Sequence, residues 1–163
     1  MTRLFALAAL TTTLLACSPA DSFNSFGVDI DDGYYQDTNV TGRMQGTMPE
    51  VGTFENEDGY GNAWNSDDWL DMQLHVKGDF GWAMVGVSAM LDDNGDIVDG
   101  SDSVIGCTGP QDGWADFDEQ ATDSVVTIDI IEIDGEPVQE IEITAEFDQA
   151  GTVVAVAHVP VGE

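Results

Sequence analysis

The chain has very few positive charges. Its 163 residues include only three Lys and Arg side chains, Arg3, Arg43 and Lys77, against 32 Asp and Glu. The acidic residues are spread along the chain and are not gathered in a tail. Because a negative surface repels phosphate groups, nucleic acid and anionic membrane surfaces are not expected as partners. Adaptation to saline surroundings is the simplest explanation. The alternatives are a solubilising surface in dilute water and a surface loaded with multivalent cations.

The chain also lacks a hydrophobic run long enough to span a bilayer. The apolar run at residues 4–15 holds about a dozen residues, whereas a transmembrane helix needs roughly 20. The run follows the single charge of Arg3, and no acidic residue occurs before Asp21. This arrangement is typical of a secretory signal peptide and argues against a plain transmembrane helix.

The apolar run ends in Leu14-Leu15-Ala16-Cys17. This tetrapeptide resembles the lipobox of bacterial lipoproteins. The resemblance implies that the Cys17 thiol carries a diacylglycerol, that the chain is cut just before it, and that the new amine is acylated. More than one acyl chain is needed for stable anchoring. Ser18, which follows the cysteine, implies retention at the outer membrane, on its periplasmic or its surface face. An ordinary signal peptide followed by a chance cysteine is the alternative.

Cleavage before Cys17 defines three segments. Residues 1–16 are the signal peptide, residues 17–27 are the lipidated cysteine and a flexible tether, and residues 28–163 are one acidic domain. The mature chain of 147 residues would keep two basic side chains against 32 acidic ones, a formal net charge of −30. Cys107 would be the only remaining thiol, and we expect it to be unpaired and buried. The oligomeric state is left open.

Alternating apolar residues predict an all-β fold, a single antiparallel β-sandwich of about eight strands, with a small β-barrel as the alternative. Residues 80–91 are apolar on both faces, which predicts a central strand covered on both sides. Asp134-Gly135 predicts a hairpin turn, and a shift of the apolar positions before it predicts a bulge near Ile130. Long loops are expected at residues 49–68 and 109–122. The expected strands are residues 27–35, 40–48, 69–77, 80–91, 103–108, 124–133, 137–147 and 152–159.

One acidic turn has the side-chain spacing of a calcium loop. Asp92, Asn94 and Asp96 alternate along it, and Ca²⁺ takes six to eight oxygen ligands. However, Ile97 stands where an EF-hand loop requires Gly. We therefore expect a hairpin turn and no cofactor, with Ca²⁺ bound by these three side chains as the alternative.

Aromatic and acidic side chains gather where one predicted loop meets the next predicted strand. Trp64, Asp67 and Asp68 lie in the loop, Trp69 begins the strand, and Trp114 lies in the other long loop. Aromatic faces beside carboxylates suit sugars or cationic groups, so these five residues are a candidate ligand site for a carbohydrate or protein partner. The alternative is that a tryptophan closes one end of the core.

Signals for catalysis are weak. Ser88 lies in a partial nucleophile motif within a strand, and Cys107 could act only if His75 or His158 lay beside it. No catalytic residue is predicted. The sequence favours a non-catalytic, lipid-anchored cell-envelope protein with a structural or binding role. A calcium-stabilised carbohydrate- or surface-binding module is the second hypothesis, and a hydrolase using Ser88 or Cys107 is the third.

Overall fold

The computed structural model describes residues 38–66, 68–110 and 115–161, so the predicted signal peptide, Cys17, the tether and the strand expected at residues 27–35 lie outside the described residues. Within these ranges no helix is long and apolar enough to cross a bilayer. Nine strands are present: β1 (Thr38–Met48), β2 (Gly52–Ser66), β3 (Trp69–Gly78), β4 (Gly81–Met90), β5 (Ser103–Gly109), β6 (Phe117–Gln120), β7 (Asp123–Ile133), β8 (Glu136–Phe147) and β9 (Gly151–Pro160).

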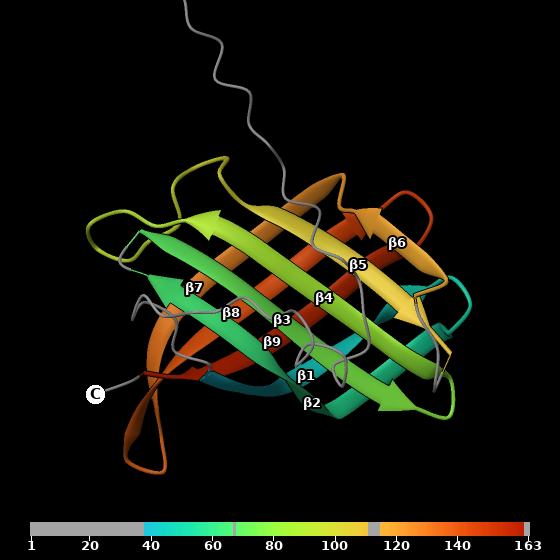
Figure 1. The fold of residues 1–163 in the computed structure, drawn as a ribbon, viewed down its shortest axis with the longest axis horizontal. Coiled ribbons are helices and arrows are strands. Elements are labelled where there is room, and N and C mark those ends of the chain that lie inside the picture. Colours follow the sequence, from blue (N-terminus) through green and yellow to red (C-terminus); the bar gives the residue numbers. More distant parts are fainter. Residues whose placement is uncertain (1–37, 67, 111–114, 162–163) are drawn as a thin grey trace, which may run out of the picture.

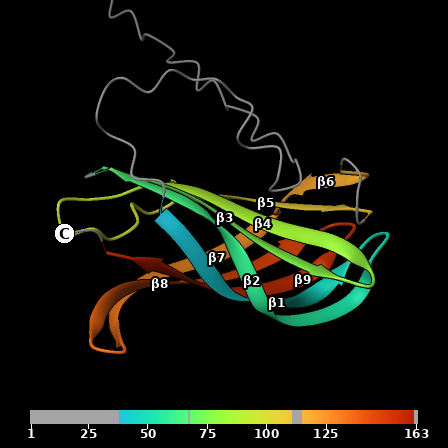
Figure 2. The same cartoon turned by 60° about the horizontal axis from the view of Figure 1, so that its bottom comes forward.

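All nine strands form one antiparallel sheet, in the order β6-β5-β4-β3-β2-β1-β9-β8-β7. The sheet curls over itself, so that β8 and β9 cross the face of β3, β4 and β5 (Figures 1 and 2). One sheet therefore supplies both layers. The all-β prediction is confirmed, and the arrangement fits a barrel-like sandwich.

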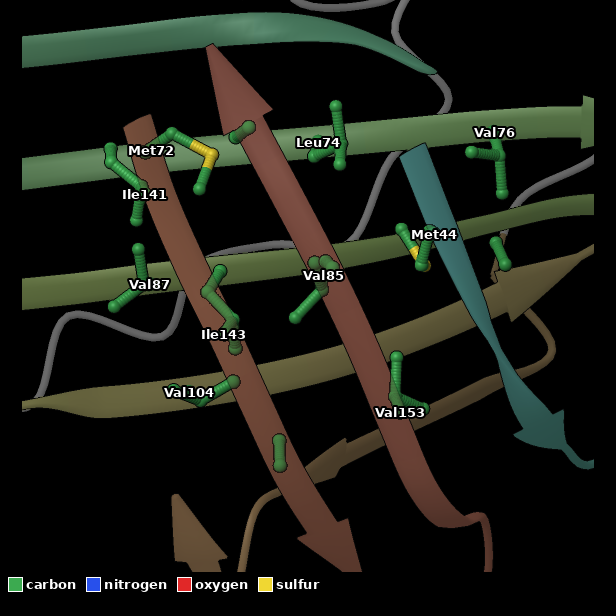
Figure 3. Packing of buried hydrophobic residues seen from close by; sticks show 14 of the residues in the cluster. Met44, Met72, Leu74, Val76, Val85, Val87, Val104, Ile141, Ile143 and Val153 are labelled. Atoms are coloured by element: carbon green, nitrogen blue, oxygen red, sulfur yellow. The ribbon is translucent and has the colours of Figure 1, made fainter. Parts of the chain in front are cut away.

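The core fills the space between the two halves of the curled sheet. On β8, Ile141 and Ile143 point inward, and Glu142 between them is exposed. They face side chains from the opposite half, among them Met72 of β3 and Val87 of β4 (Figure 3). Full burial of each such side chain contributes about 1.5–3 kcal/mol. The period-two pattern thus identified the inward face of β8 correctly.

The β7–β8 hairpin confirms one prediction and contradicts another. Asp134 and Gly135 both have positive φ, 54° and 89°, as a two-residue type I′ turn requires. Pairing then runs without a break from Ile133↔Glu136 to Asp123↔Glu146, so the bulge predicted near Ile130 is wrong. The end of the hairpin extends beyond the rest of the sheet (Figure 2), and the Ile130 side chain is 66% exposed. At this end of the hairpin, the apolar positions therefore do not indicate which face of the strand points into the core.

The predicted loops at residues 49–68 and 109–122 are wrong in part. The first is mostly β2, a strand of 15 residues, and the second contains the short strand β6. β2 lies between β1 and β3: it pairs with β1 from Gly52 to Ala63 and with β3 from Tyr60 to Ser66. Its glycines fit this position: a Cβ on Gly61 would collide with the backbone oxygen of Gln73 on β3. Tertiary pairing overrides the low strand propensity of Gly, Asn, Asp and Glu.

The central strand β4 is buried on both faces, as predicted. Its inner face joins the main core, whereas Trp82 and Met84 form a second cluster with Cys107 on the outer face. Cys107 is buried as expected, but the structure gives it as disulfide-bonded. The expectation of an unpaired thiol at this position is therefore wrong.

Candidate functional site

The acidic turn with calcium-loop spacing uses the carboxylate of Asp92 to hold its backbone. Asp92 Oδ1 accepts hydrogen bonds from the backbone N–H groups of Asn94, at 2.8 Å, and Asp96, at 3.0 Å. These bonds lower the pKa of Asp92 below its usual range. The predicted turn is present, and Asp92 serves as its cap. Across the described ranges, no group of three or more His, Cys, Asp and Glu side chains is arranged to hold a metal ion.

The predicted aromatic site is described only in part. Trp69 begins β3 and is 43% exposed, next to Met90 on β4. Asp68 lies in the turn before β3, and its backbone oxygen accepts a hydrogen bond from Leu91 N. Trp64 lies on β2, but its side chain, like Asp67 and Trp114, is outside the described part.

The residues considered for catalysis are kept apart by the strand register. Ser88 pairs with Asp71, whereas His75 pairs with Met84. Cys107 pairs with Met84 from the other side, so two strand spacings, roughly 10 Å, separate it from His75. His158 lies on β9, in the other half of the sheet. No cysteine–histidine or serine–histidine pair forms among these four residues.

A row of partly buried polar side chains crosses the outer face of β2 and β3. Tyr60 stacks on His75 with ring centroids 5.8 Å apart, and the Lys77 ammonium lies 5.8 Å from the Tyr60 ring centroid. Burial, and to a lesser extent the charge of Lys77, lowers the pKa of His75 to about 4. On the same face, burial raises the pKa of Asp71 to about 6, although a hydrogen bond from Ser88 opposes the shift. At neutral pH, His75 is therefore uncharged. Asp71 is a carboxylate, and its partial burial lowers the stability of the folded state.

A long hollow lies elsewhere, on the outer face of β1. Two clefts of about 550 and 540 Å³ are joined by a narrower one of about 230 Å³. The narrow cleft shares Arg43 with the first and Gln45 with the second, so the three form one groove along β1. From Thr41 to Thr47 this groove is about 20 Å long. We call it the β1 groove. Its main polar lining residues are Thr41, Arg43, Gln45, Thr47, Glu55, Glu57, Asp58, Glu140 and His158.

The β1 groove follows from strand alternation and one bulge. Val40, Met44 and Met48 point into the core, so the odd-numbered residues, Thr41, Arg43, Gln45 and Thr47, face outward. The register of β1 and β2 shifts after Gly42↔Gly59, so that Arg43 stands opposite two residues, Glu57 and Asp58. This two-against-one arrangement is a β-bulge, which redirects side chains. The bulge therefore sets two carboxylates opposite the only arginine of the described chain.

Charge in the β1 groove is mixed but mainly negative. His158 Nε2 lies 2.8 Å from Glu140 Oε2, across the β8–β9 pair. Arg43 makes no hydrogen bond or ion pair with the residues that the structure describes. The guanidinium can thus offer its planar donors to a ligand oxygen, while Glu57 and Asp58 attract a positive group. The floor includes Val154 and Val156, which supply an apolar contact surface.

Sequence reasoning missed the β1 groove because its parts come from strands that are distant in the sequence. β9 lies beside β1 although more than 100 residues separate them, and β2 was interpreted as a loop. The only available signal was Arg43 itself, an outward-facing cation in a chain that has almost none. Comparison of the chain with protein-family models, curated proteins and solved structures finds no match.

Proposed function

We propose that this protein is a lipid-anchored component of the bacterial outer membrane, with a non-catalytic domain that binds a ligand in the β1 groove. Two observations support this proposal. Leu14-Leu15-Ala16-Cys17 at the end of an apolar run supplies the anchor. The groove supplies a surface with one uncommitted cation and several carboxylates. The nucleophiles and histidines considered above do not meet, which favours binding over catalysis.

The composition of the β1 groove favours an extended, positively charged ligand. Four carboxylates, those of Glu55, Glu57, Asp58 and Glu140, line it against one arginine. A basic peptide of about six residues in extended form matches its length of about 20 Å. Arg43 would then bind a backbone carbonyl of that peptide, since a guanidinium only donates hydrogen bonds. A cationic carbohydrate shares this chemistry.

The anchor is tested by fractionating cells that express Cys17→Ser. We expect the wild-type chain in the membrane fraction and the variant in the soluble fraction. Cys107→Ser is the matched control, because it removes the other cysteine and leaves the lipobox intact. Continued membrane association of Cys17→Ser would contradict the proposal.

Intact mass adds a second readout. The chain has two cysteines, and Cys107 is disulfide-bonded in the structure. A Cys17 thiol that carries a diacylglycerol cannot also form a disulfide, so in the lipidated chain that we propose Cys107 has no second cysteine of its own chain to pair with. We expect the membrane-extracted protein to begin at Cys17 and to carry the mass of the lipid. A full-length chain lighter by two hydrogens, without lipid, would contradict the anchor.

A further inference from the structure

β7 is an open edge of the sheet. In the described part of the chain it pairs with β8 alone, and β6 ends the other side of the sheet (Figure 1). In an antiparallel pair, alternate residues direct their N–H and C=O groups to the partner strand. The two-residue turn makes Ile133↔Glu136 a hydrogen-bonded pair, so the odd-numbered residues of β7 bond to β8. The even-numbered residues, Val126, Ile128 and Ile130 among them, direct their backbone groups outward.

The same edge carries apolar side chains that the domain leaves uncovered. Seven large hydrophobic residues of the described chain are exposed, and three of them lie on β7. Val125 is 61% exposed and Ile130 is 66% exposed. A long, apolar edge strand is a ready template for pairing with another strand, and proteins usually protect it with charges, bulges or proline. β7 has an unbroken register and no proline, and its only such protection is three carboxylates.

We propose that β7 is a self-association surface, on which a second copy of this chain docks through its own β7. The two strands run antiparallel about a two-fold axis at Ile128, the midpoint of the strand. Ile128 then pairs with Ile128 of the partner subunit, and the outward backbone groups of each strand bond to those of the other. Ile130 packs beside the partner's Val126, and this contact covers the exposed surface of Ile130.

The charges of β7 permit this register and exclude the next one. The strand carries three carboxylates, Asp123, Asp129 and Glu132. About an axis at Ile128 they face the partner's Ile133, the partner's Thr127 and the partner's Ser124, so no β7 carboxylate directly opposes another. Asp102 accepts a hydrogen bond from Ser124 and therefore lies near the partner's Glu132, where salt must screen the two charges. An axis one residue further on would set Asp129 directly against the partner's Asp129. In the favoured register these two lie on the diagonal, about 7–8 Å apart, where salt screens them.

This geometry predicts a weak dimer that depends on salt. Edge pairing of one strand buries less area than a standard interface, and each subunit is strongly negative. We expect sedimentation velocity of the full chain, in density-matched detergent, to show a dimer at about 1 M NaCl and a monomer at about 0.01 M. A monomer at both salt concentrations and at high protein concentration would overturn the proposal.

Charge variants locate the interface. Thr127→Glu sets a carboxylate opposite the partner's Asp129 twice in each dimer, and we expect at least a tenfold weaker association. Thr144→Glu is the matched control: it adds the same charge on the outward face of β8, one strand away from the edge. Thr127→Glu combined with Asp129→Lys restores opposite charges and should restore the dimer. Equal effects of the two Glu variants would place the interface elsewhere and overturn the proposal.

Cross-linking tests the register. In the proposed dimer, residue 127 lies opposite residue 129 of the partner subunit, at a separation that suits a disulfide. Oxidising a mixture of Thr127→Cys and Asp129→Cys chains should therefore give a covalent heterodimer, mapped to these two positions by mass spectrometry. Each variant alone should give little of this product. If the chain instead stays monomeric while the amides of Val126, Ile128 and Ile130 resist hydrogen exchange, the edge is covered by other residues of its own chain, and the proposal fails.

Discussion

At the scale of single residues, the outer face of β3 holds two titrating groups with opposite effects on stability. Asp71 and His75 are four residues apart, and burial disfavours the charged form of each. The pKa of Asp71 rises to about 6 and that of His75 falls to about 4, so both shifts act between about pH 4 and pH 6.5. Their contributions partly cancel in the wild-type protein, and single variants separate them.

Asp71→Asn should stabilise the protein at neutral pH and have little effect in acid. Below about pH 4, Asp71 is protonated in the folded chain and increasingly so in the unfolded chain, so burial costs little. As the pH rises from about 4 to about 6, the unfolded chain ionises first and the folded state loses stability. We expect the difference in Tm between variant and wild type to grow over this range. A difference that is independent of pH would contradict the burial of this carboxylate.

His75→Gln should show the opposite trend. Above about pH 6.5 the imidazole is neutral in both states, so the variant loses only the ring contacts with Tyr60 and Trp82. As the pH falls towards about 4, His75 becomes protonated in the unfolded chain but stays neutral in the folded chain. The wild type therefore loses stability. The variant should therefore gain on the wild type in acid. His158→Gln, on the outer face of β9, is the control for removal of a histidine as such.

At the scale of elements, the sequence predicted the strands that carry a clear apolar pattern and missed β2 and the short β6, which carry none. β8 alternates Ile141, Glu142 and Ile143 between core and solvent, and its bounds were close to the prediction. β2 has no such alternation. It is extended because it pairs with β1 and β3, and not because of its side-chain pattern. The β1 groove depends on that same pairing. It could not have been predicted without knowing that β9 returns beside β1.

Gly42 should be essential to the close approach of β1 and β9. A Cβ at this position would collide with the backbone oxygen of Val156, which cannot move without moving β9. We expect Gly42→Ala to lower the free energy of unfolding by about 1–3 kcal/mol, as overpacking does. Gly86→Ala is the matched control on β4, because its Cβ would meet only side-chain atoms, the nearest at 3.2 Å. Equal costs in chemical denaturation would show that the approach is not limiting.

At the scale of the whole molecule, charge sets the conditions under which the fold is stable. The 163-residue chain has a formal net charge of −29, and the basic side chains are too few to pair with 32 acidic ones. Ions in solution must therefore screen the repulsion between the carboxylates. Screening lengths fall from about 30 Å at 0.01 M salt to about 3 Å at 1 M. The Tm should rise steeply over this range, and the β7 dimer should form in the same range.

Thermal melts in different salts separate screening from specific calcium binding. Since Asp92 is occupied as the cap of its own turn, we expect CaCl₂ and MgCl₂ at equal ionic strength to raise the Tm equally. A specific site would behave differently, because a ligand at 100 times its Kd adds about 2.7 kcal/mol to stability. Extra stabilisation by Ca²⁺ alone that disappears in Asp96→Asn would therefore establish a calcium site at this turn. If both divalent salts match each other in wild type and variant, the carboxylates act through their summed charge.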